Sequence, residues 1–192
     1  MATVARPHPR SRLHRLFTRF ARARGGATTV EFAFVALPFL TLVFAIVELG
    51  LVFFVSVTLE NAVIDTGRKI RTGELQTAGG TAATFKTAVC TEMAWIGAAC
   101  SDALSLDVRT FAGFSASNTA VAANQPQTPC WDPGGPGSVV MVRAYYAWPL
   151  ITPLLETGLK SSNGKRIVTA VAAFANEPYA DTIAPPVVCP AS

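Results

Sequence analysis

The stretch GATTVEFAFVALPFLTLVFAIVELGLVFFVSVTLE, residues 26–60, combines a long apolar run with isolated glutamates. Residues 32–47 contain no charge, and the 11 residues after Glu48, 49–59, contain none either. A helix needs about 20 apolar residues to cross a hydrocarbon core of about 30 Å. The stretch is therefore predicted to form a single transmembrane helix of roughly 20 to 28 residues.

The excess basic charge is confined to the first 26 residues, which hold seven arginines and no acid. Subtracting these from the 16 basic residues leaves nine against 12 acidic residues, so the remainder carries a net charge of −3. A basic run beside a membrane helix indicates orientation, with the positive end in the cytoplasm, rather than nucleic-acid binding. The C-terminal part is then expected in the periplasm.

All four cysteines follow the apolar run: Cys90, Cys100, Cys130 and Cys189. An even count in an exported segment predicts two disulfides. A zinc site is the alternative, but no C-x-x-C pair is present, and the only histidines, His8 and His14, lie in the basic leader. We therefore expect no metal and no cofactor.

The position of the apolar run does not fit an ordinary secretory signal. Such a signal has an apolar region of about 7 to 15 residues, followed by a small-x-small cleavage site. Here the run is longer, it contains Glu48, and no convincing A-x-A site follows it. Cleavage before the run fits better, with Gly26 as the last leader residue, Ala27 as the new N-terminus and Glu31 as the fifth mature residue.

The order of features around Gly26 resembles the processing site of type IV prepilins and pseudopilins: a basic leader, Gly, four residues, Glu31, Phe32 and an apolar helix. More closely, GATTVEFAFVALPFLTLVFAIVELG followed by LENAVIDTGRKIRTGE, residues 59–74, resembles TadE-like proteins of the Flp (tight adherence) pilus assembly system. NEPY, residues 176–179, also resembles the motif that closes the last strand in that family. The resemblance is concentrated in residues 22–74.

The resemblance implies a minor pseudopilin-type structural protein that a prepilin peptidase cuts between Gly26 and Ala27. It implies as partners that peptidase, the other minor subunits, the major pilin and the inner-membrane assembly platform. It also implies that Glu31 and Phe32 form a motif for processing and for entry into the filament. The implied location is the bacterial inner membrane, crossed once, with incorporation into the pilus left open.

Two glutamates in the apolar run need partners or tolerant positions. Cleavage after Gly26 creates an α-amino group on Ala27, near one helical turn from Glu31, and the two charges stabilise each other in a low-dielectric site. The alternative is an interfacial Glu31 that reaches the lipid headgroups. Glu48, roughly 25 Å farther along the helix, either pairs with a basic group on a partner helix or marks the outer interface.

A helical stripe extends the apolar run into a stalk. Gly73 is expected to end this stalk. The residues of the stripe, which recur at helical spacing, are Leu59, Ala62, Val63, Thr66 and Ile70. The chain then divides into a cleaved leader, residues 1–26, a membrane helix with its stalk, residues 27–73, and an extracytoplasmic domain, residues 74–192. GELQTAGGT, residues 73–81, is expected to be a hinge-like linker.

The extracytoplasmic part is predicted to be a small disulfide-bonded α+β domain of pilin-like class, with one helix and a roughly three-stranded antiparallel sheet. Helical spacing marks Phe85, Val89, Met93 and Ile96, and alternation marks strands that start at Leu104, Val139 and Arg166. Four cysteines allow three connectivities. We favour Cys90 with Cys100, which needs a turn at Gly97, and Cys130 with Cys189, which ties the CWDPGGPG loop to the tail.

No catalytic constellation emerges from the sequence. The mature chain would lack histidine, the commonest general base. Asp102 and Asp107 are imaginable as a hydrolytic pair, but Asp107 is expected on the solvent face of its strand. Tyr145, Tyr146 and Trp148 form either a contact surface for another subunit or a carbohydrate or, as we favour, core residues plus an edge of the sheet. A non-enzymatic pilus protein is the leading interpretation; the alternatives are a membrane-anchored binding domain outside a pilus and an envelope hydrolase.

Overall fold

The computed structural model describes residues 26–97, 99–116, 128–152, 161–162, 164–180 and 189. The chain divides into two units, residues 1–44 and residues 45–192, and the long helix α2, Ala27–Arg71, contributes to both. The helix continues through Pro38. Its end at Arg71 agrees with the expected stop, since Gly73 follows with a left-handed φ of 76° that favours glycine. Residues 1–25 of the basic leader lie outside the described residues.

The second unit contains an antiparallel sheet with the strand order β1-β2-β4-β3. Its three long strands are β1, Leu104–Phe111, β2, Val139–Pro149, and β4, Lys165–Ala175, whereas β3, Ser161–Ser162, is a two-residue edge. The α+β class and the three strands predicted from alternation are confirmed. The strand β2, which carries Tyr145 and Tyr146, lies between β1 and β4.

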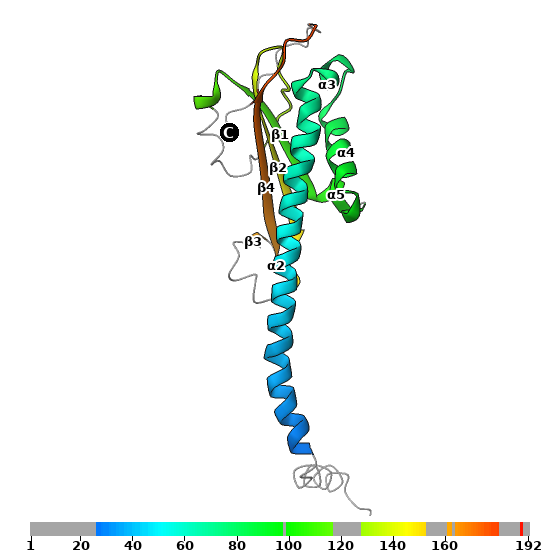
Figure 1. The fold of residues 1–192 in the computed structure, drawn as a ribbon, viewed down its shortest axis with the longest axis vertical. Helices are drawn as coiled ribbons and strands as arrows, with labels where there is room; N and C mark the ends of the chain where they lie inside the picture. Colours follow the sequence, from blue (N-terminus) through cyan, green and yellow to red (C-terminus); the bar gives the residue numbers. More distant parts are fainter. Residues whose placement is uncertain are drawn as a thin grey trace, which may run out of the picture. The chain divides into compact units, whose positions relative to one another are not determined.

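Helices α2 and α4, Ala82–Glu92, pack on one face of this sheet (Figure 1). The predicted stalk stripe supplies the helical side of the core from Leu59 to Ile70, and Phe85 and Val89 add the contribution of α4. Alternate strand residues face these helices, because successive side chains of a strand point to opposite sides. The buried strand side chains are Leu104, Val108, Val140, Val142, Ala144, Tyr146, Val168 and Ala170.

The segment after α2 is more ordered than the expected hinge. It contains a one-turn helix α3, Glu74–Thr77, and Leu75 packs against the core. The side-chain amide of Gln76 donates hydrogen bonds to the carbonyls of Ile70 and Pro133, at 3.0 and 3.2 Å. The expectation of a hinge-like linker is therefore wrong, because this segment is fixed to its neighbours by packing and by hydrogen bonds.

The expected second helix ends before Met93. A 3₁₀ turn η2, Ala94–Ile96, and a short helix α5, Ala99–Ala103, follow it, and Gly97 provides the turn with a φ of 69°. This turn brings Cys90 and Cys100 together as a disulfide with Cα atoms 5.7 Å apart. A second disulfide joins Cys130 to Cys189. Both pairs are the ones favoured from the sequence.

Candidate functional site

The N-terminal part of α2 presents apolar side chains on all sides of the helix. Its large residues from Val30 to Phe44 are exposed, including Phe32 at 72% and Phe34 at 77%. A helix that is apolar all round belongs in a membrane or among other apolar helices. Among the described residues, α2 is the one helix long and apolar enough to cross a membrane.

The residues predicted for processing lie together at the start of α2. Gly26 immediately precedes the helix, Ala27 opens it, and Glu31 follows one turn later with an exposed side chain. A Cβ atom on Gly26 would meet no other atom within 4 Å, so the fold itself does not require glycine there. The reason for glycine at this position is thus to be sought outside the folded chain.

The structure gives Glu48 a partner that the sequence did not suggest. Its side chain is only 4% exposed, and its two carboxylate oxygens accept hydrogen bonds from the backbone N–H groups of Ile151 and Thr152, at 2.5 and 2.8 Å. The bonding groups of Glu48 are thus backbone N–H groups of the same unit rather than a basic group on a partner helix. The carboxylate fixes the segment that follows β2 to α2.

This contact also limits the stretch of α2 that lipid can surround. Beyond Glu48, Val55 and Leu59 are fully buried in the core. The last turns of the apolar stretch therefore pack against the sheet and α4. Residues 27–47 remain, about 20 residues, which matches the length needed to cross a hydrocarbon core.

The NEPY segment joins the end of α2 to the glycine-rich loop after Cys130. The Asn176 side-chain amide donates to the carbonyls of Pro133 and Gly135 at 2.9 and 3.0 Å. Glu177 forms an exposed ion pair with Arg71 and donates its backbone N–H to the Arg71 carbonyl at 2.8 Å. The motif thus fastens the end of β4 to the end of α2.

Tyr179 completes this junction. Its ring lies so close to Gly73 that a Cβ atom there would be 2.3 Å from the ring. Its hydroxyl donates to the Gly134 carbonyl at 3.2 Å. Gly73 therefore has two reasons to be glycine, its left-handed backbone and the ring packed against it.

Asp107 is not on a solvent face, and that expectation is wrong. It is 1% exposed and lies between two arginines, with the nearest nitrogens of Arg109 and Arg143 at 3.0 and 2.5 Å. The backbone N–H of Cys130 donates to the same carboxylate at 2.8 Å. Asp102, by contrast, is exposed on α5. The two carboxylates differ completely in environment and do not resemble a catalytic pair.

The aromatic residues of β2 belong to the domain interior. Tyr145 and Tyr146 are 4% and 2% exposed, and the ring of Tyr146 contacts that of Trp148 at 6.4 Å. Burial raises the pKa of both tyrosines above the ordinary value of 10.0. The favoured interpretation, a place in the core, is correct for these two tyrosines.

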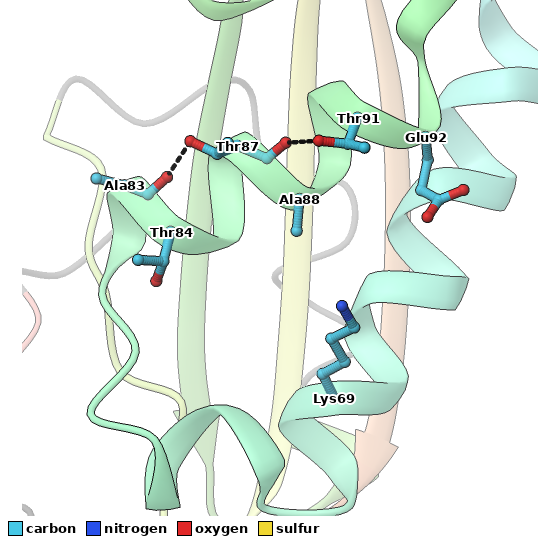
Figure 2. Close-up of a pocket in the computed structure, with 7 residues that line it drawn as sticks. All are labelled: Lys69, Ala83, Thr84, Thr87, Ala88, Thr91 and Glu92. Atoms are coloured by element: carbon cyan, nitrogen blue, oxygen red, sulfur yellow. Dashed lines mark hydrogen bonds between the residues drawn. The ribbon is translucent and has the colours of Figure 1, made fainter.

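An open groove of about 550 Å³ runs between α2 and α4. Figure 2 shows its polar lining, with Thr84, Thr87 and Thr91 on α4 and Lys69 of α2 pointing toward that helix. The hydroxyls of Thr87 and Thr91 already donate to backbone carbonyls one turn earlier in α4. Within the described part of the chain no three His, Cys, Asp or Glu side chains gather as metal ligands.

Residues 26–68 match the family model described as TadE-like protein. The match begins at Gly26 and covers the exposed apolar part of α2 together with most of the stretch that packs into the core. No curated protein and no solved structure matches the chain. The match is consistent with a TadE-like protein of the Flp/Tad pilus system, and it supports a pilus-associated protein with an N-terminal membrane-spanning helix.

Proposed function

We propose that this TadE-like protein is a minor pseudopilin-type structural subunit of a Flp (tight adherence) pilus, held in the bacterial inner membrane by α2. The observation that carries the proposal is the exposed apolar surface of residues 30–44, on a helix whose family match starts at residue 26. Such a surface suits lipid before assembly and neighbouring subunit helices afterwards. The chain would act through helix packing and not as an enzyme.

We further propose that prepilin peptidase removes residues 1–26. In support, α2 begins at Ala27, the residue that cleavage would make the N-terminus. The lack of any neighbour near Gly26 supports a glycine retained for entry into a peptidase site. The seven arginines of the leader would hold it in the cytoplasm.

The domain after α2 would then fold in the periplasm. Its two disulfides support this location, because such bonds persist in oxidising compartments and are rare in the cytosol. The bond between Cys130 and Cys189 closes a long loop, and in the chain-entropy model it contributes on the order of 4 kcal/mol. Protein isolated from the envelope with four free thiols would contradict this location.

Glu31 is proposed to pair with the new α-amino group of Ala27, within one chain or between neighbouring subunits. The partners proposed for the mature helix are the other minor subunits, the major pilin and the inner-membrane assembly platform. The exposed Glu31 side chain, on an otherwise apolar segment, supports a role that is completed by another molecule or by cleavage.

The proposed processing is tested by the intact mass and the N-terminal sequence of the membrane-extracted protein. We expect a mature chain that starts at Ala27, and accumulation of the full-length form when Gly26→Leu blocks the peptidase site. Gly50→Leu is the matched control, because Gly50 also lies on α2 and has no atom within 4 Å of a built Cβ. A mature N-terminus beyond residue 40 would refute the pseudopilin assignment.

A further inference from the structure

The second unit carries a patch of exposed and half-buried aromatic, aliphatic and basic side chains where α2 enters it. Ile151 is 80% exposed, Phe54 50% and Trp95 44%. These side chains come from α2, η2, the end of β2, the segment after β2 and the start of β4. Trp148 and Arg166 are half-buried, and Trp148 also packs against the core. We define the interface patch as Phe54, Trp95, Trp148, Ile151, Lys165 and Arg166.

Ring contacts join the three aromatic members of the interface patch, and strand register places its two basic members nearby. The ring centroid of Trp95 lies 4.8 Å from that of Phe54 and 6.3 Å from that of Trp148. In the strand register Trp148 stands opposite Arg166, and the next residue, Pro149, stands opposite Lys165. Three aromatic rings and two basic residues therefore share this end of the unit.

Chain continuity identifies what lies next to the interface patch. The unit begins at Ala45, directly after the exposed apolar residues 30–44. Within it, the Glu48 carboxylate accepts a hydrogen bond from the backbone N–H of Ile151. If residues 27–47 cross a bilayer, the segment fixed by Glu48 sits where the helix leaves the hydrocarbon. A large exposed side chain such as Ile151 would then meet the lipid surface.

We propose that the interface patch inserts into the headgroup layer of the membrane that α2 crosses, so that the domain rests on the bilayer through a second contact. Tryptophan favours this layer because its ring is amphipathic, and Lys or Arg beside it meets lipid phosphates. The acidic residue Glu92, three positions before Trp95, is not part of the interface patch; it lines the groove between α2 and α4 together with Lys69 (Figure 2). The inference rests on the proposed anchoring by α2.

The test uses the full chain, reconstituted into phosphatidylcholine vesicles with a minority of phosphatidylglycerol and with lipids brominated near the headgroup. One variant keeps only Trp95, by Trp131→Phe and Trp148→Phe. The matched control keeps only Trp131, which packs on Phe85 in the core. Insertion of the interface patch predicts quenching of Trp95 that exceeds that of Trp131 by about twofold or more.

Ile151→Asp should reduce the quenching of Trp95, whereas Ile64→Asp should not, since Ile64 is also exposed, at 54%, but belongs to α2 beyond the patch. A single Trp95→Phe change in the otherwise natural chain gives a second measurement that spares the core, and it should reduce the quenched emission. Equal quenching of Trp95 and Trp131 overturns the inference, including the case in which a second copy covers the patch. Vesicle flotation separates the two proposals, because a chain that fails to float refutes the anchoring itself.

Discussion

Asp107 on β1 and Arg143 on β2 stand directly opposite each other in the antiparallel ladder and form an ion pair in which both side chains are 1% exposed. The pair is extended by Arg109, whose Nε donates to both carboxylate oxygens at 3.0 Å. One carboxylate thus balances two guanidinium groups between adjacent strands. Such an arrangement is costly to break, because its charges have already lost their water.

Asp107→Asn should destabilise the domain by about 3 to 5 kcal/mol, because it removes the buried charge that pairs with both guanidinium groups. Urea unfolding of the detergent-solubilised protein, followed by near-UV circular dichroism, measures this loss. Asp102→Asn is the control, since Asp102 is exposed on α5, and it should change stability by less than about 0.5 kcal/mol. A tolerant Asp107→Asn variant would show that the ion pair contributes no net stability.

Glu48→Gln should loosen the segment after β2, because one amide oxygen replaces two carboxylate oxygens that accept from Ile151 and Thr152. We expect a loss on the order of 1 to 3 kcal/mol and faster amide exchange at these two residues. Glu60→Gln, an exposed change on the same helix, should alter neither. Unchanged exchange at Ile151 and Thr152 in Glu48→Gln would contradict the assigned contact.

Gly73→Ala should destabilise the junction of α2 with NEPY by more than about 1 kcal/mol, because alanine is strained at a positive φ and its Cβ would overlap the Tyr179 ring. Thermal unfolding of the two variants Gly73→Ala and Gly113→Ala measures the difference. Gly113 has open space around it and no positive φ, so its substitution should be nearly neutral. Equal melting temperatures for these variants would show that the Tyr179 contact is dispensable.

Tyr145 should make stability depend on alkaline pH. Burial raises the pKa of its phenol above the ordinary value of 10.0, so the folded state keeps its proton after the unfolded state has begun to ionise. The stabilisation is complete below about pH 10 and is lost as the pH rises through the folded pKa. Tyr145→Phe should therefore lessen the decline of stability above pH 10, measured by urea unfolding over a pH series.

Tyr146 contributes to this decline in the same direction, because burial raises its pKa too. The variant with both Tyr145→Phe and Tyr146→Phe should consequently show the smallest alkaline loss. At neutral pH Tyr145→Phe should cost little, since no described residue accepts or donates a hydrogen bond at its hydroxyl. A decline that is unchanged in the double variant would assign it to other groups.

The elements of this fold were predictable because their signals are local. Alternation located the strands from Leu104, Val139 and Arg166 to within about a residue, and Gly73 marked the end of α2. The partners of Asp107 and Glu48 were not predictable. Asp107 meets Arg143 through the register of two strands. Glu48 meets Thr152, which lies more than 100 residues away in the chain. The alternating pattern of β1 therefore suggested that Asp107 faces solvent, whereas the fold pairs it with a buried arginine.

The hydrogen bonds of Glu48 decide which glutamate can serve as a control for Glu31. Glu48 would have been the obvious comparison for Glu31, but its carboxylate fixes the segment after β2, so its substitution would perturb the domain. Glu60 is the better control, because it is an exposed glutamate on the same helix. Its substitution by Gln removes one charge without breaking a described contact of the domain.

Glu31→Gln should impair assembly while leaving folding, membrane insertion and most processing intact. The change removes the charge that is proposed to pair with the α-amino group of Ala27 and keeps the side-chain shape. In a desolvated site between subunits this loss weakens association. The measurements are N-terminal processing, co-purification with other pilus components and surface filaments, in Glu31→Gln and Glu60→Gln side by side. Normal filaments with Glu31→Gln would mean that Glu31 is only a tolerated interfacial charge, whereas normal processing with reduced co-purification, absent in Glu60→Gln, would support its role in assembly.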